Sequence, residues 1–273
     1  MPVSPIRFVT LNVSDLDRSV DFYTRLLDLT PVPAPEQDGP RQAWLSAGPT
    51  VLRLSEVPGG RASAWIGDDL QRGFRHIGLK VVDLDARVER LHAEGVRFHL
   101  EPLDAAGGVR IAFFYDPDGV LLEFIQGDLQ YDEVWDEELV TAERAQPVPA
   151  APRFDHVAVT VDELQDTLGF YRSALGFGVA GRLFQPQDPR GFEITYLHAA
   201  GTVLEVFTYG AEKQDPPWRP DADLLGFRGI GVTEEDPDAV ADRLAEAGAK
   251  RDAANPCLLV DRDGLPVLVE GVQ

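Results

Sequence analysis

The chain repeats one short pattern four times, and this repeat limits the possible folds more than any other feature of the sequence. Each copy opens with a short β-type run, continues with an acidic turn and a helical pattern, and ends in further β-type runs. The openings lie at Phe8, His76, His156 and Gly229, at intervals of 68, 80 and 73 residues. The sequence therefore predicts an α+β fold of four β-α-β-β-β units.

Each unit contains one amphipathic helix. In the third unit, Leu164, Leu168 and Tyr171 follow one another in steps of four and three, which places them on one helix face. Aspartate or glutamate precedes each helical pattern, where it suits the N-terminal cap and the helix dipole. Glycines such as Gly176 stand where the helices are expected to end.

A change of composition divides the repeats into two pairs. Segment 128–152 is first acidic and then rich in proline and alanine. We interpret it as a linker with a short helix near Asp132–Arg144. The predicted domains are therefore 1–127 and 153–273, each made of two units.

Bulk properties exclude several classes of protein. The net charge of −21 over 273 residues repels nucleic acid and anionic membranes. No apolar run of about 20 residues could span a bilayer, and the N-terminus has no signal-peptide pattern. The single cysteine, Cys257, excludes an intrachain disulfide and is compatible with the cytoplasm. We expect a cytoplasmic monomer or homodimer that acts on a small molecule, without nucleic acid or membrane partners.

Strand alternation places two histidines and two glutamates on matching faces. In the opening strands of units 2 and 3, the aliphatic side chains point one way, and His76 and His156 point the other way. In the closing strands, Glu123 and Glu205 each stand between apolar neighbours, so they too point away from the helix side. The separations from histidine to glutamate are 47 and 49 residues. The two units therefore offer the same pair at the same place in the repeat.

This coincidence points to a metal site. A lone histidine in a strand is usually structural, and a lone glutamate usually lies on a solvated edge. A glutamate within an apolar strand is costly to bury unless it is paired with a charge or bound to a metal. The same His/Glu pair occurs twice, so we predict one divalent ion, Zn, Ni, Co, Mn or Fe, held by four side chains. They are His76, Glu123, His156 and Glu205. Residues expected to contact the substrate beside them are Phe74, Lys80, Phe113, Thr160, Tyr196 and Phe207.

The outer units lack this pair. Phe8 and Arg53 occupy the histidine and glutamate positions of unit 1, Gly229 replaces the histidine of unit 4, and Glu270 is displaced by two residues from its expected place. A second site is therefore not expected, and units 2 and 3 must pair within one chain or across a dimer. Three histidines without a repeat partner are left out of the predicted site: His92, His99 and His198.

Three segments carry a family resemblance: SVDFYTRLLDL (Ser19–Leu29), GFYRSALGF (Gly169–Phe177) and FYDPDGVLLEF (Phe114–Phe124). Together and in this order they resemble the vicinal oxygen chelate superfamily, which includes glyoxalase I, bleomycin-resistance proteins and extradiol dioxygenases. The resemblance implies glyoxalase-like domains with cup-shaped half-barrel sheets and metal ligands on the first and last strands of each unit. It also implies that inner units pair with each other, as do outer units.

Four protein ligands would leave two adjacent positions on an octahedral ion, which favours isomerisation or epimerisation over oxygenation. The reaction would begin with proton abstraction next to a carbonyl, with Glu205 or Glu123 as the base. Our leading hypothesis is a lyase of the lactoylglutathione type. Alternatives are an acyl-thioester epimerase and an Fe(II)-dependent extradiol dioxygenase, in which His198 or Tyr196 would be the acid–base group. A non-catalytic, antibiotic-binding protein would instead use the aromatic residues Trp44, Trp65, Phe113 and Phe207.

Overall fold

A computed structural model of the chain describes residues 5–35, 39–63, 65, 68–216, 221, 223–253 and 255–272. The four predicted β-α-β-β-β units are all present. Unit 1 contains β1 (Phe8–Val13), α1 (Leu16–Asp21), the π-helical turn η1 (Phe22–Leu26), β2 (Thr30–Val32), β3 (Gln42–Ser46) and β4 (Val51–Glu56). Unit 2 contains β5 (Gly73–Lys80), α2 (Leu84–Ala93), β6 (Phe98–Asp104), the short 3₁₀ turn η2 (Ala106–Gly108), β7 (Arg110–Tyr115) and β8 (Leu121–Gln126).

The second half of the chain repeats this order. Unit 3 contains β10 (Arg153–Thr160), α4 (Leu164–Leu175), β11 (Gly178–Gln185), β12 (Phe192–Ala199) and β13 (Thr202–Thr208). Unit 4 contains β14 (Gly226–Glu234), α5 (Pro237–Glu246), β15 (Lys250–Arg251), β16 (Leu258–Val260) and β17 (Pro266–Gly271). The predicted α+β class is confirmed.

Local sequence explains where these helices begin and end. The side chains of Asp15, Asp83 and Asp236 each accept a hydrogen bond from a backbone N–H in the first helical turn, as expected of N-caps. Glu163 precedes α4 without such a bond. Gly176 ends α4 in the left-handed conformation, with φ of 75°, which a residue with a side chain adopts less readily.

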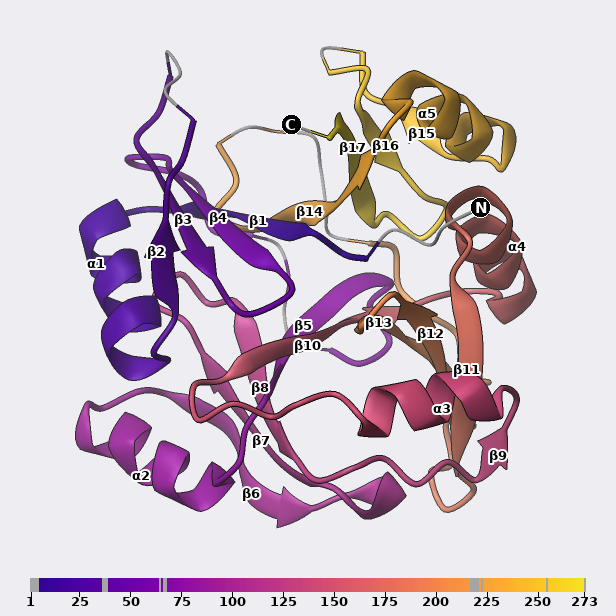
Figure 1. Cartoon of the computed structure of the whole chain (residues 1–273), viewed down its shortest axis with the longest axis horizontal. Helices are drawn as coiled ribbons and strands as arrows, with labels where there is room; N and C mark the ends of the chain where they lie inside the picture. The colour runs from indigo at the N-terminus through magenta and orange to yellow at the C-terminus, as the bar shows by residue number, and fades with distance from the viewer. Residues whose placement is uncertain are drawn as a thin grey trace.

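The sheets combine units from opposite halves of the chain. In the described residues, β15-β16-β17-β14-β1-β4-β3-β2 form one sheet from units 4 and 1. The other, in the order β6-β7-β8-β5-β10-β13-β12-β11-β9, comes from units 2 and 3 (Figure 1). We call them the outer and inner sheets. Each sheet contains one unit from segment 1–127 and one from segment 153–273. The division of the chain into these two domains therefore stays a prediction.

The inner sheet brings the predicted ligand strands together at its centre. Opening strands β5 and β10 pair antiparallel, and each is flanked by the closing strand of its own unit in parallel, β8 beside β5 and β13 beside β10. Units 2 and 3 therefore meet within one chain, which answers the question that the sequence left open.

The predicted linker is partly built into the inner sheet. Strand β9 (Glu133–Val134) pairs with β11 at the sheet edge, and α3 (Glu137–Arg144) confirms the C-terminal part of the predicted helix. Figure 1 shows α3 in front of the inner sheet. The segment thus contributes structure beside unit 3 as well as a connection.

Turns of units 2 and 4 bind the helices of the preceding units. The hydroxyl of Tyr23 donates to Asp116 at 2.9 Å, and that of Tyr171 donates to Asp261 at 2.8 Å. Both aspartates also accept two backbone N–H bonds within their own turns. These buried bonds, which we call the turn clasps, link the outer and inner sheets in each half of the chain.

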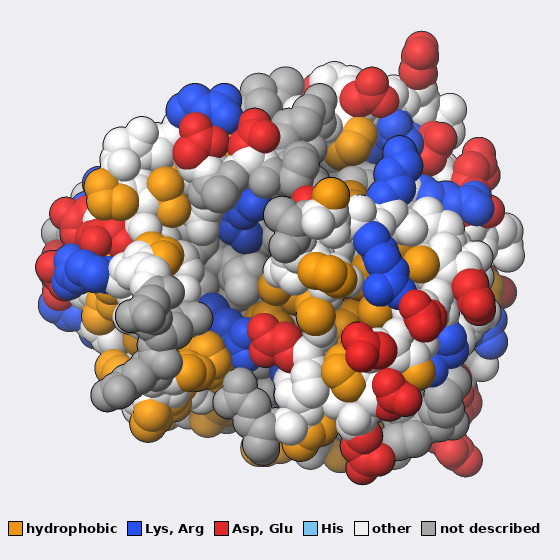
Figure 2. All heavy atoms as spheres, turned by 90° about the horizontal axis from the view of Figure 1, so that it is seen from above, with side chains coloured by type: hydrophobic (Ala, Val, Ile, Leu, Met, Phe, Trp, Pro, Cys, Tyr) orange, Lys and Arg blue, Asp and Glu red, His pale blue; other side chains and the backbone are white. Residues whose placement is uncertain are grey.

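The surface carries mixed charges. Figure 2, a view from the side of the outer sheet, shows acidic and basic side chains interspersed with apolar ones. Among the described residues, no helix is both long and apolar enough to cross a membrane.

Candidate metal centre

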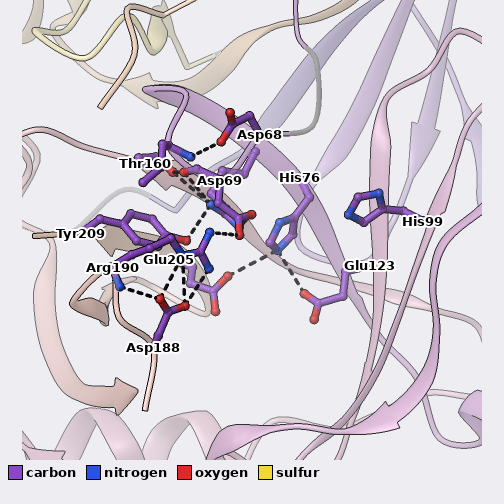
Figure 3. A network of polar contacts seen from close by, with 12 residues as sticks. Asp68, Asp69, His76, His99, Glu123, Thr160, Asp188, Arg190, Glu205 and Tyr209 are labelled. Carbon is purple, nitrogen blue, oxygen red and sulfur yellow. Dashed lines mark hydrogen bonds and ion pairs between the residues drawn. The ribbon is translucent and has the colours of Figure 1, made fainter. Parts of the chain in front are cut away.

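The four predicted ligands converge on one point at the centre of the inner sheet. His76 comes from β5, Glu123 from β8, His156 from β10 and Glu205 from β13, and all four side chains are buried. Their donor atoms lie within 4.8 Å of one another. Figure 3 shows His76 between the carboxylates of Glu123 and Glu205.

The separations between these atoms fit the ligands of a single ion. The two histidine Nε2 atoms are 3.1 Å apart. Glu123 Oε2 lies 3.2 and 3.0 Å from Nε2 of His76 and His156, and Glu205 Oε2 lies 3.4 Å from both. Ligands about 2.1 Å from an ion are about 3.0 Å apart at octahedral edges and about 3.4 Å apart at tetrahedral edges.

A second observation supports a cation here. Glu205 Oε2 is buried and, within the described part of the chain, accepts no hydrogen bond. A buried carboxylate oxygen without a donor is costly, and a metal ion is one of the few partners that removes this cost. The N₂O₂ donor set suits Zn, Ni, Co, Mn or Fe(II). The residues present therefore fit a divalent metal ion.

Asp155 holds the ring of His156. Its Oδ2 lies 3.1 Å from Nδ1 of His156, so the ring proton on Nδ1 leaves Nε2 free to bind a metal. Asp155 is an extra residue in β10, because Phe154 pairs with Leu79 and His156 with the adjacent Gly78. Sequence alternation missed it, since a residue next to a ligand normally points to the opposite face.

The absence of a side chain at Gly78 leaves space for the His156 ring. A Cβ atom at Gly78 would lie 2.1 Å from Cε1 of His156. The ring therefore lies flat against the β5 backbone, which a larger residue would prevent. No glycine was predicted to shape the site, although strand alternation placed Gly78 on the same face of the opening strand as His76.

Neighbouring charges set the ionisation of Glu123 and His156. Burial opposes ionisation of Glu123, but hydrogen bonds from His156 and His76 outweigh it and lower its pKa to about 2. Burial likewise opposes protonation of His156, yet Glu205, Asp155 and Glu123 together raise its pKa well above the usual value. Without a metal, the carboxylates thus favour a proton on His156, so a proton and a metal ion compete for this side chain.

A cavity of about 420 Å³ opens beside the four ligands. His76, Glu123 and Glu205 line it, together with a mainly apolar wall from both inner units. Of the predicted substrate-contacting residues, Phe113, Tyr196 and Phe207 also line it. Their contact with a substrate stays a prediction.

Three other predicted contacts lie elsewhere. Phe74 stacks on Phe227 of the outer sheet, with ring centres 3.9 Å apart. Lys80 is buried, and its charge adds to the larger effect of His156 in lowering the pKa of Asp155. Thr160 donates to the backbone carbonyl of Asp69. None of the three lines the described cavity. For Phe74 the reason is a bulge at Arg75, which reverses the alternation on which the prediction rested.

Arg75 takes the cavity position that alternation gave to Phe74. Its guanidinium donates to Asp69, Thr160 and Tyr209 and lies 4.1 Å above the ring of Phe207. Arg190 donates to the same Asp69 carboxylate at 3.0 Å. Figure 3 shows four members of this network, Asp69, Thr160, Arg190 and Tyr209, on the side of His76 away from His99. The bulged residues Arg75 and Asp155 thus occupy corresponding places in the two units but have different roles.

Only some of the residues named for the alternative functions line the cavity. Trp65 lines the cavity with Phe113 and Phe207, but Trp44 lies in the outer sheet. His198 is buried, and its Nε2 lies 3.3 Å from Glu143 of α3 rather than in the ligand cluster. This position agrees with the prediction that His198 is not a metal ligand.

The outer sheet is built like the inner one but without ligands. Phe8 pairs with Gly231 as His156 pairs with Gly78. Arg53 lies 3.4 Å above the Phe8 ring and 2.7 Å from Glu270. A guanidinium and an apolar ring therefore occupy the region of the outer sheet that corresponds to the ligand cluster. The ligand cluster of the inner sheet is the only potential metal-binding group of its kind in the described ranges.

Comparison with known proteins agrees with this architecture. The model of the glyoxalase/bleomycin resistance protein/dioxygenase superfamily matches residues 6–124 and 153–254. The chain belongs to this superfamily. The first matched segment covers units 1 and 2, and the second covers unit 3 and the part of unit 4 before β16. Neither segment includes the predicted linker 128–152.

Its relatives include enzymes. A lactoylglutathione lyase of Pseudomonas putida is 32% identical over 141 residues, which cover 42% of this chain and 81% of that protein. A lactoylglutathione lyase of Arabidopsis thaliana is 29% identical over 189 residues, 66% of this chain and 57% of that protein. The crystal structure of glyoxalase I from Zea mays covers 97% of this chain and 92% of its own, with a TM-score of 0.69 and 21% identity. This last likeness concerns the fold.

Proposed function

We propose that this superfamily member is a metal-dependent lyase of the glyoxalase I type. It would convert the hemithioacetal of a thiol and a 2-oxoaldehyde into a 2-hydroxyacyl thioester. The observation that carries the proposal is the buried convergence of His76, Glu123, His156 and Glu205 beside a cavity. The lactoylglutathione lyases among its relatives support the reaction class.

These four side chains would hold the ion. When bound, a divalent metal supplies Lewis acidity to two vicinal oxygens of a substrate and makes the neighbouring C–H bond more acidic. Asp155 keeps His156 in the tautomer that presents Nε2. The mainly apolar cavity wall lowers the polarity around the charged groups, which strengthens their electrostatic effect.

Glu205 is the stronger candidate for the base. Glu123 receives hydrogen bonds from both histidines, whereas Glu205 Oε2 accepts none from the described residues. In the reaction, a carboxylate oxygen removes the proton from the carbon that bears the sulfur. The electron pair moves through an enediol, and the proton returns to the adjacent carbon. One C–H bond breaks and another forms, so no oxidant or reductant is required.

Tyr196 supports Glu205 from the neighbouring strand. The two residues lie directly opposite each other in the β12–β13 pair. Burial, together with the charge of Glu205, raises the pKa of the Tyr196 hydroxyl well above its usual value. The hydroxyl therefore keeps its proton and can donate it in a hydrogen bond to a carboxylate or a substrate oxygen.

The test is turnover by the metal-loaded protein. After loading with Zn, Ni or Co, we expect thioester formation from methylglyoxal and glutathione. Glu205→Gln should reduce kcat at least about 100-fold, as expected for loss of a general base. The Glu205→Gln variant should still bind metal. Loss of turnover with the metal retained would show that Glu205 acts as a base and not only as a ligand. A fully loaded protein that turns over no hemithioacetal would contradict the proposal.

Oxygen consumption separates the dioxygenase alternative. Metal-loaded protein should consume no oxygen with catechols, because four protein ligands leave too few positions for a catechol and O₂ together. Oxygen uptake with Fe(II) would instead assign the ring-cleaving reaction to this site.

A further inference from the structure

One polar side chain that lines the cavity is used by neither the ligand cluster nor the network around Arg75. His99, on β6, lines the same cavity as His76 and Glu123. Figure 3 shows its ring directed toward His76 and Glu123, on the side away from Asp69. The wall around it is apolar, including Leu100 and Phe113.

The backbone turns His99 toward the cavity by a bulge. Phe98 pairs with Phe114 and Leu100 with Phe113, so two steps along β6 correspond to one along β7, and His99 is the extra residue. Bulges next to active sites commonly redirect a side chain. The same device places Arg75 and Asp155 beside the ligand cluster.

Tyr115 fixes the orientation of the ring. Its hydroxyl oxygen lies 3.0 Å from Nδ1 of His99, and the guanidinium of Arg97 lies 3.8 Å above the Tyr115 ring. When the tyrosine hydroxyl donates to Nδ1, the imidazole proton resides on Nε2. That N–H is then a hydrogen-bond donor for a molecule in the cavity.

Phe113 lies between His99 and the ligand cluster. Its ring centre is 4.9 Å from that of His76 and 6.5 Å from that of His99, with edge contacts to both. A substrate whose vicinal oxygens lie at the cluster can therefore extend over Phe113 toward His99. The 2-oxoaldehyde part is small, so the part that extends is the thiol arm.

We infer that His99 is a specificity-determining residue that donates a hydrogen bond from Nε2 to a carbonyl or carboxylate oxygen on the thiol arm. The inference rests on the proposed function for the position of the reacting end. The acceptor oxygen must lie on the thiol arm beyond the sulfur. A short thiol without such an acceptor would not contact His99.

The experiment compares two thiols in the metal-loaded protein. Kinetics are measured with methylglyoxal adducts of glutathione, which carries acceptor oxygens, and of 2-mercaptoethanol, which has a short arm. His99→Phe keeps an aromatic ring but removes the donor. It should raise KM for the glutathione adduct about tenfold, with little change in kcat or metal content. KM for the 2-mercaptoethanol adduct should stay unchanged.

Two further variants sharpen the result. Tyr115→Phe removes the hydroxyl that orients His99 and should raise the same KM by a smaller factor. His92→Gln is the matched control, because His92 pairs with Glu101 at 3.0 Å on the surface and does not line the described cavity. It should leave both adducts unaffected.

The outcomes distinguish this inference from the proposed function. Equal KM changes for both adducts, no change for either, or a fall in kcat with both would overturn the role of His99. If the wild type turns over neither adduct, the lyase proposal fails, and binding of S-lactoylglutathione to the loaded protein then tests His99 by calorimetry. Weaker binding in His99→Phe supports the inference, whereas equal binding or no binding by the wild type overturns it.

Discussion

At the scale of single residues, the site depends on neighbours that alternation could not predict. Sequence pattern placed His76, His156, Glu123 and Glu205 on one face, and the structure brings them together. The prediction from strand alternation was wrong where a strand contains an extra residue. Beyond the bulges at Arg75 and Asp155, the side chains of each strand point to the opposite face from the one that alternation predicts. A bulge leaves no clear mark in a single sequence.

Loss of the Asp155 carboxylate should weaken metal binding. Asp155→Ala removes the acceptor on Nδ1 of His156, so we expect a loss of about 10- to 100-fold in metal affinity. Asp155→Asn keeps an acceptor oxygen and should lose less. Competition with a chelator of known affinity measures both. Equal affinities in Asp155→Ala and the wild type would show that Asp155 does not orient the ligand.

A methyl group at Gly78 should displace His156. The new Cβ would meet the imidazole ring at 2.1 Å, so Gly78→Ala is expected to reduce metal content strongly. Gly169→Ala is the matched control, because a Cβ there meets nothing within 4 Å in helix α4. It should retain the metal and gain about 0.5–1 kcal/mol of stability. Both effects can be measured by metal analysis and urea unfolding.

At the scale of elements, segment 128–152 packs against a residue next to the candidate metal centre. Tyr131 donates to Glu143 of α3 at 2.6 Å, and its ring makes an edge contact with that of Tyr196, 5.2 Å away. Tyr196 in turn lies opposite Glu205. Composition predicted a linker here, because acidic and proline-rich sequence is typical of one, but composition does not reveal which side chains pack.

Removing the Tyr131 hydroxyl should destabilise this segment. Tyr131→Phe leaves the partly buried Glu143 carboxylate without its short hydrogen bond, and we expect a loss of about 1–2 kcal/mol in the free energy of unfolding. Hydrogen exchange should rise in α3 and β9 more than in the outer sheet. Unchanged stability and exchange would indicate that the segment is only a connection.

The turn clasps predict a pH dependence. Burial, with the charge of Asp263, raises the pKa of Asp261 from its usual 3.8 to about 7. Between these values the folded chain binds the extra proton and the unfolded chain does not, so this stabilisation is complete below pH 3.8 and is lost as the pH rises through 7. The difference of about three pH units corresponds to at most about 4 kcal/mol.

Replacing Asp261 should remove this dependence. Asp261→Asn cannot ionise, so its stability relative to the wild type should rise between pH 4 and pH 8 in urea unfolding. A constant difference between Asp261→Asn and the wild type would show that Asp261 does not take up the proton.

At the scale of the whole molecule, four copies of one unit make one potential metal site. The repeat predicted the units, and the missing ligands of units 1 and 4 predicted a single site. Which units share a sheet came from the family resemblance, because pairing between β1 and β14 joins residues more than 200 positions apart. Local pattern contains little information about such distant contacts. Phe8 and Arg53 occupy the corresponding positions of the outer sheet, so this sheet offers no matching His/Glu pair there.

The central claim is that the inner sheet alone holds one divalent ion. Metal analysis of the full chain after supplementation with Zn, Ni or Co tests it most directly. We predict one equivalent per chain in the wild type, almost none in His156→Ala, and no change in Arg53→Lys, which alters only the outer sheet. Two equivalents per chain, or one equivalent that persists in His156→Ala, would contradict the account, as would a wild-type protein that retains no metal.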